Sequence, residues 1–108
     1  MKNKRVIVAL DSKNLIKTKS LVNKIRKEVF AFKIGYEFFL NHGLFGYKEI
    51  KKISPKIFLD LKLHDIPNTV ANAILAINKL NPLLTTVHIT GGDQMLKSSI
   101  KYKKNSVK

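Results

Sequence analysis

Three charged residues with regular spacing stand near the middle of the sequence. Asp60, Lys62 and Asp65 form the pattern Asp-x-Lys-x-x-Asp within the stretch KIFLDLKLHDIPNT. A carboxylate held beside the anionic group of a substrate repels the bound ground state, and that repulsion is relieved if the group leaves as neutral carbon dioxide. An adjacent ammonium stabilises the negative charge left on carbon and can then donate a proton to it. The residue types therefore favour a decarboxylation in which Lys62 is the proton donor and no cofactor is required.

The elements around these residues decide how they can meet. The apolar run that begins at Lys56 is typical of a buried strand that leaves into a loop. Because side chains alternate along a strand, Asp60 and Lys62 are expected on one face, and both charges are expected inside. A structural ion pair at a strand end is the alternative interpretation, since such pairs also perturb pKa values.

Four strands alternate with four helices along the chain. The strands are expected at 5–10, 30–34, 56–63 and 84–90, and the helices at about 14–29, 36–53 with a break at 42–46, 67–80 and 93–102. Four such units imply a parallel α/β sheet with helices outside, for which a doubly wound sheet is the competing layout. Charged residues at the ends of the first three strands favour the first four units of a (β/α)₈ barrel. We expect one partial barrel domain over residues 1–108, with a basic polar tail at 101–108.

The composition restricts the partners of the chain. It has 108 residues, a net charge of +14 and no cysteine. Because the lysines are dispersed and only Arg5 and Arg26 are arginines, we expect a solvated basic surface and no specific nucleic-acid binding. The longest apolar runs are far shorter than the roughly 20 residues that cross a bilayer, so no membrane association is expected. The lack of cysteine fits a reducing compartment, and we expect the cytoplasm.

The run DLKLHDIPNT from Asp60 to Thr69 resembles the orotidine 5'-phosphate decarboxylase family. Further matches are VALD at 8–11, FKIG at 32–35 and VHITGG at 87–92, in the order and spacing of the first half of that family. The resemblance covers about residues 6–100, whereas (β/α)₈ barrels typically run to about 250 residues. The chain is therefore expected to form part of such a barrel.

The resemblance implies an activity and a set of catalytic residues. The activity is the cofactor-independent conversion of orotidine 5'-phosphate to UMP and carbon dioxide, the last step of de novo pyrimidine synthesis. Lys62 is implied as the proton donor and Asp60 as its paired acid. Lys33 is implied as a partner of Asp60 and of the ribose.

Further roles implied by the resemblance concern substrate binding and assembly. Asp11 is implied as a ligand of a ribose hydroxyl. The residues that match Asp65 and Thr69 reach into the site of the neighbouring subunit in the family, which implies a homodimer. No metal ligand is implied.

Several alternatives stay open at the level of sequence. The family binds the substrate phosphate and contacts the pyrimidine through segments after the fourth unit, so this chain alone is expected to be incomplete or inactive. It could be an inactive remnant, one half of a split enzyme completed by a second chain, or a basic interaction protein. Among enzymes, the alternative is a magnesium-dependent sugar-phosphate decarboxylase of the same superfamily.

Overall fold

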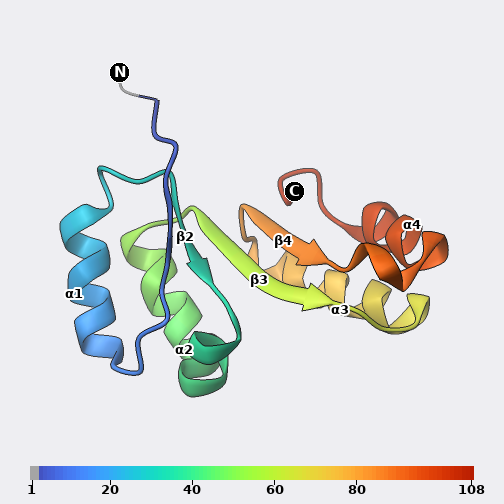
Figure 1. The fold of residues 1–108 in the computed structure, drawn as a ribbon, viewed down its shortest axis with the longest axis horizontal. Coiled ribbons are helices and arrows are strands. Elements are labelled where there is room, and N and C mark those ends of the chain that lie inside the picture. Colours follow the sequence, from blue (N-terminus) through green and yellow to red (C-terminus); the bar gives the residue numbers. More distant parts are fainter. Residues whose placement is uncertain (1–2) are drawn as a thin grey trace. The chain divides into compact units, whose positions relative to one another are not determined.

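Strands and helices alternate along the chain in the computed structural model, which describes residues 3–108 (Figure 1). The strands are β1 (Ile7–Ala9), β2 (Ala31–Ile34), β3 (Ile57–Leu63) and β4 (Leu84–Val87). The helices are α1 (Leu15–Ile25), α2 (Tyr36–Ile53), α3 (Pro67–Leu80) and α4 (Asp93–Tyr102), with a short 3₁₀ helix η1 (Ile89–Gly91) before α4. Neighbouring strands pair in the order β1-β2-β3-β4. The predicted succession of β/α units is confirmed.

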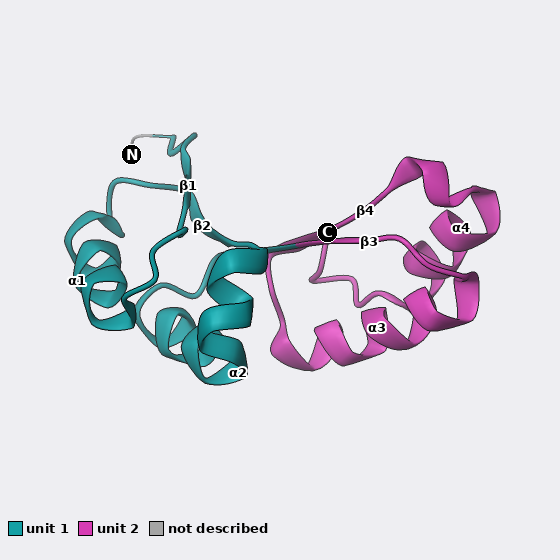
Figure 2. Cartoon of the chain, turned by 60° about the horizontal axis from the view of Figure 1, so that its bottom comes forward, with its two compact units in different colours: residues 1–60 teal, residues 61–108 magenta. Residues whose placement is uncertain are grey.

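The chain divides into two compact units, whose boundary lies within β3 (Figure 2). The first unit is Met1–Asp60 and the second is Leu61–Lys108. The expectation of one domain over 1–108 stays a prediction.

In the first unit, two parallel strand pairs carry the core. β1 pairs with β2 through Ile7 and Ala31, and β2 pairs with the start of β3 through Phe32 and Ile57. Both α1 and α2 lie on the same side of β1 and β2 (Figure 2). Apolar side chains from every element of this unit except β1 itself are almost fully buried: Leu10, Val22, Phe32, Ile34, Phe38, Tyr47, Ile50, Ile57 and Leu59. Burial of such side chains is the main favourable contribution to folding.

The helices of the first unit differ from the predicted ones at their ends and breaks. The Asn14 side chain accepts the Lys17 N–H at 2.9 Å and so caps α1, but the helix ends at Ile25 rather than near residue 29. α2 has one kink, at Gly43, where φ is 60° and ψ is −156°. Gly46 does not break the helix. It is needed there because a Cβ at this position would collide with the side chain of His42, one turn earlier.

In the second unit, α3 and α4 pack against each other. The buried side chains between them and the strands include Val70, Ile74, Ile77 and Met95. β4 ends at Val87, three residues before the predicted boundary, because the chain turns into η1 at Ile89–Gly91. Pro67 occupies the first turn of α3, where its missing N–H needs no partner.

Residues 101–108 do not form the basic polar tail that the sequence had led us to expect. Lys101 and Tyr102 belong to α4, and Val107 is only 1% exposed. The Asn78 side chain holds this segment by donating to the Tyr102 carbonyl at 2.8 Å and accepting the Lys104 N–H at 3.0 Å. The prediction was wrong because one apolar residue among polar neighbours shows no periodicity.

The end of this segment also pairs with β4. Lys108 donates its N–H to the Leu83 carbonyl at 3.0 Å, and its own carbonyl accepts the Thr85 N–H at 2.9 Å. Hydrogen bonds from one residue to the two neighbours of Leu84 are the pattern found between parallel strands. Residues 107–108 thus add a short parallel contact to the edge of β4.

Candidate active site

The side chains of Lys33 and Asp60 meet in the first unit. Lys33 Nζ lies 3.4 Å from Asp60 Oδ2, and the two residues stand on the adjacent strands β2 and β3. The Asp60 side chain is 6% exposed and that of Lys33 is 31% exposed. A buried carboxylate is strongly destabilising without a cation nearby, so Lys33 compensates Asp60 while keeping access to solvent. The structure therefore brings these two predicted site residues together.

Asp11 lies two residues after the end of β1, between two residues that are held in place. On one side Leu10 is buried, and its N–H donates to the Lys33 carbonyl at 2.9 Å. On the other side the Ser12 carbonyl lies 3.4 Å from Nε2 of His42. Because a carbonyl only accepts, the ring nitrogen that faces it must carry the proton. The Asp11 side chain itself is exposed, at the carboxyl end of its strand.

His42 is a residue of this region that the sequence reasoning had used only as a helix breaker. Its ring packs edge-on against Phe38, with centroids 4.8 Å apart and planes at 61°. Phe38 is fully buried, and Gly46 lies against both side chains. The imidazole is therefore fixed within α2 while it reaches the loop after β1.

β3 departs from regular strand geometry at Lys62. The φ angle there is 49°, and the Lys62 N–H donates to Oγ1 of Thr86 on β4 at 2.9 Å. The Lys62 side chain is exposed. The prediction that it would be buried like Asp60 is wrong, because regular alternation assumes extended backbone at every residue of the strand. Asp60 ends the first unit, and Lys62 belongs to the second.

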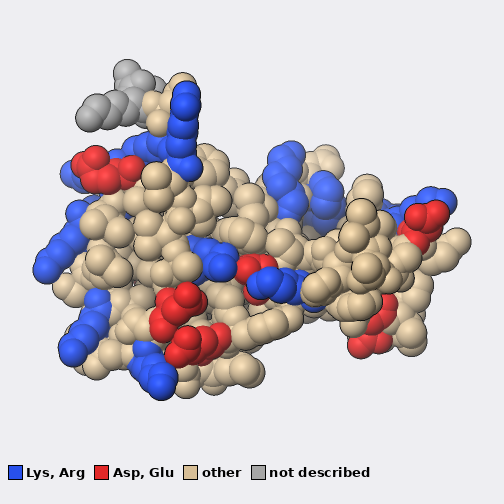
Figure 3. Space-filling view, viewed as in Figure 1, with Lys and Arg blue, Asp and Glu red and all other residues tan. Residues whose placement is uncertain are grey.

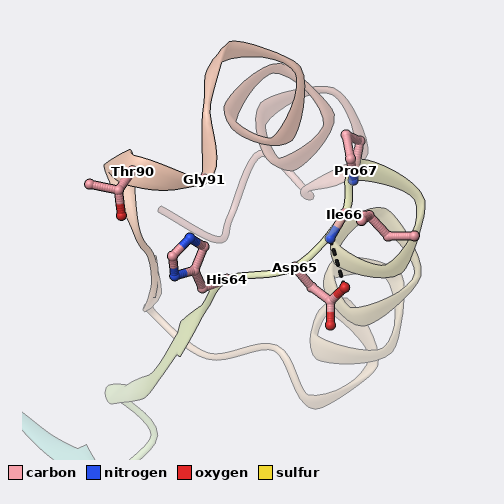
Figure 4. Close-up of a pocket in the computed structure, with 6 residues that line it drawn as sticks. All are labelled: His64, Asp65, Ile66, Pro67, Thr90 and Gly91. Atoms are coloured by element: carbon pink, nitrogen blue, oxygen red, sulfur yellow. Dashed lines mark hydrogen bonds between the residues drawn. The ribbon is translucent and has the colours of Figure 1, made fainter.

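A cavity of about 500 Å³ lies beyond the end of β3 in the second unit (Figure 4). Six residues line it: His64, Asp65, Ile66, Pro67, Thr90 and Gly91. One carboxylate oxygen of Asp65 accepts the Ile66 N–H at 2.7 Å, which orients the side chain at the start of α3. Thr69 lies exposed in the first turn of the same helix. Both residues predicted to act at a neighbouring subunit are thus accessible.

His64 also contacts a second histidine. Its ring centroid lies 5.0 Å from that of His88, with the planes tilted by 32°. Both residues are exposed, and they come from the ends of β3 and β4. The sequence did not reveal this contact, because 24 positions separate the two histidines and neither spacing nor periodicity links them.

A strong electrostatic perturbation of a carboxyl group occurs on α2, away from these residues in sequence. Hydrogen bonds from Lys52 at 2.8 Å and Lys19 at 2.9 Å lower the pKa of Glu49 from 4.5 to about 2. On the same helix, burial raises the pKa of Tyr47 from 10.0 to about 12. On the face shown in Figure 3, Lys and Arg side chains are dispersed in separate groups rather than gathered in one patch.

Within residues 3–108, no group of three or more His, Cys, Asp or Glu side chains is placed to hold a metal ion. Over the same range, no helix combines the length and the apolar character needed to cross a bilayer.

Comparison with known proteins connects this arrangement to one family. The family model described as orotidine 5'-phosphate decarboxylase / HUMPS matches residues 4–107. The chain belongs to this family. An orotidine 5'-phosphate decarboxylase from Wolbachia sp. subsp. Brugia malayi (strain TRS) is 46% identical over 101 residues, which are 94% of this chain and 45% of the relative. The protein of the same name from Fusobacterium nucleatum subsp. nucleatum is 48% identical over 89% of this chain and 40% of the relative.

Solved structures of the orotidine 5'-phosphate decarboxylase family match the fold as well. The crystal structure of the enzyme from Lactobacillus acidophilus has a TM-score of 0.77 and 42% identity, over 95% of this chain and 48% of that chain. The chain therefore spans slightly less than half the length of the relatives it matches. The predicted fold class, the first four β/α units of a (β/α)₈ barrel, is confirmed.

Proposed function

We propose that this chain supplies the decarboxylating residues of an orotidine 5'-phosphate decarboxylase, and that they act in a barrel completed by four further β/α units. The observation that supports this most is the pair of Lys33 and Asp60, in which a carboxylate with a 6% exposed side chain lies 3.4 Å from an ammonium. Asp60 opens the Asp-x-Lys-x-x-Asp motif, and residues 4–107 match the family.

The proposed reaction needs only groups of the protein. The buried charge of Asp60 repels the carboxylate of the substrate, and the repulsion ends when the carbon–carbon bond breaks and carbon dioxide leaves. The electron pair of that bond stays on the pyrimidine carbon, where the ammonium of Lys62 stabilises it and then donates a proton. UMP is the product, and no cofactor takes part. Lys33 restrains Asp60 electrostatically, and together with Asp11 it binds the ribose.

We also propose that the active assembly is a cytoplasmic homodimer. Asp65 and Thr69 are both exposed, as residues that serve a neighbouring subunit must be before assembly. α2 also exposes large apolar side chains that a second copy would cover, with Tyr36 53%, Leu40 84%, Leu44 49% and Phe45 67% exposed.

Turnover of orotidine 5'-phosphate tests the proposal. The purified 108-residue chain is assayed alone and with a separately produced polypeptide that carries the remaining β/α units of a relative. We expect no useful turnover by the chain alone, because binding energy from distant parts of a substrate is needed at the reacting carbon. Activity should appear when the second polypeptide is added, and the mass of the complex in solution should show two copies of each chain.

Matched variants connect the activity to the proposed residues. Lys62→Ala should abolish the restored turnover, whereas Lys97→Ala, at an exposed lysine of α4, should leave it unchanged. Equal activity of both variants would refute the role of Lys62. Robust turnover by the chain alone would refute the requirement for the second half, and no turnover with the second half would favour an inactive remnant.

A further inference from the structure

Lys62 has an unusual backbone conformation for its residue type and position. Within residues 3–108, only Lys62 and Asn81 combine a side chain with a positive φ, at 49° and 50°. Asn81 stands at the end of α3, where a left-handed residue is common and asparagine is well suited to it. Lys62 lies inside β3 and lacks a short polar side chain that could relieve the strain locally. Its conformation must therefore be held by its surroundings.

The hydroxyl of Thr86 provides such a restraint. It accepts the Lys62 N–H at 2.9 Å, so a side chain of β4 replaces the usual backbone acceptor of a strand. β4 is itself anchored, because the His88 N–H donates to the Leu63 carbonyl at 2.9 Å and Thr85 pairs with Lys108. The acceptor therefore sits on a strand that is fixed near both of its ends.

We propose that Thr86 is a positioning residue that holds the backbone of Lys62 in the left-handed conformation and thereby keeps its ammonium at an exposed position. Strained conformations of this kind persist only where neighbouring groups enforce them, and they are concentrated at functional sites. The consequence for catalysis rests on the proposed function, in which Lys62 must reach a bound substrate. The backbone restraint itself can be tested without any substrate.

Stability measurements test whether Lys62 is strained. Glycine adopts positive φ freely, whereas alanine does not, so Lys62→Gly should be more stable than Lys62→Ala, by about fivefold in the folding equilibrium constant. Lys56 lies directly before β3 and does not have a positive φ, so it provides the control. There the order should reverse, with Lys56→Gly less stable than Lys56→Ala. If Lys62→Gly is the less stable variant at position 62 as well, the inference is wrong.

Spectroscopy of two Thr86 variants tests the restraint. Thr86→Val removes the acceptor with little change in shape, and Thr86→Ser retains a hydroxyl. A residue with positive φ gives a strong intraresidue cross peak between its amide and α protons in NMR spectra. We expect this signal for Lys62 in the wild type and in Thr86→Ser, and its loss in Thr86→Val. A signal that persists in Thr86→Val would overturn the proposed role of Thr86.

Kinetics of the completed barrel separate this inference from the proposed function. Thr86→Val should lower kcat at least tenfold with little change in KM, and Thr86→Ser should restore most of the rate. If the wild type shows no turnover but the NMR signal of Lys62 depends on Thr86, the proposed function fails and the positioning stands. If turnover is present and Thr86→Val changes neither kcat nor the NMR signal, the positioning fails and the function stands.

Discussion

Replacement of Lys33 by methionine would remove the ammonium that lies beside the buried carboxylate of Asp60. At 3.4 Å and an effective dielectric constant of about 20, two unit charges attract by about 5 kcal/mol. The Lys33 side chain is 31% exposed, so solvent screens part of this attraction. Because removal of one partner from a buried ion pair typically costs about 3–5 kcal/mol, we expect Lys33→Met to lose roughly 2–4 kcal/mol of stability at pH 7.

Urea unfolding at pH 7 measures this effect, and the midpoint of Lys33→Met should fall below that of the wild type. Lys33→Met/Asp60→Asn should be more stable at pH 7 than Lys33→Met alone, because no buried charge is left.

A second lysine provides the control for this experiment. Lys52 pairs with Glu49 at 2.8 Å, but its side chain is 75% exposed. Exposed ion pairs typically contribute about 1 kcal/mol or less, so Lys52→Met should have a much smaller effect. Equal losses for Lys33→Met and Lys52→Met at pH 7 would refute the reasoning.

Two further predictions concern pH. Hydrogen bonds from Lys52 and Lys19 lower the folded-state pKa of Glu49 to about 2. The stability that this group contributes is therefore present above pH 4.5 and is lost as pH falls from there to about 2. In Glu49→Gln, acid unfolding followed by circular dichroism should depend less steeply on pH in this window. Burial raises the folded-state pKa of Tyr47 to about 12, so its contribution is present below pH 10 and is lost as pH rises toward 12. Tyr47→Phe should therefore unfold less steeply with alkali, and an unchanged alkaline profile would contradict the assignment.

The sequence predicted the parts of the site that depend on regular strands. Alternation along the third strand placed Asp60 inside, and the family resemblance implied Lys33 as its partner. The structure finds the two side chains 3.4 Å apart. The alternation fails at Lys62, because the positive φ of this residue is tied to the hydrogen bond that its N–H donates to Thr86 on β4, 24 residues later in the sequence. His42 was missed for a similar reason, since its contact with the loop after β1 spans 30 residues.

The short pairing of Lys108 with Leu83 and Thr85 has a practical consequence for anyone who labels or immobilises this protein. Both backbone groups of Lys108 are engaged by the edge of β4, and Val107 beside it is buried. A purification tag or fluorophore attached directly to Lys108 would disturb its pairing with β4, and a linker with high strand propensity would extend that pairing along the sheet edge. A glycine- and serine-rich spacer avoids this, because such sequences have low strand propensity and remain flexible. Asn3, which is exposed, is the better site for a rigid attachment.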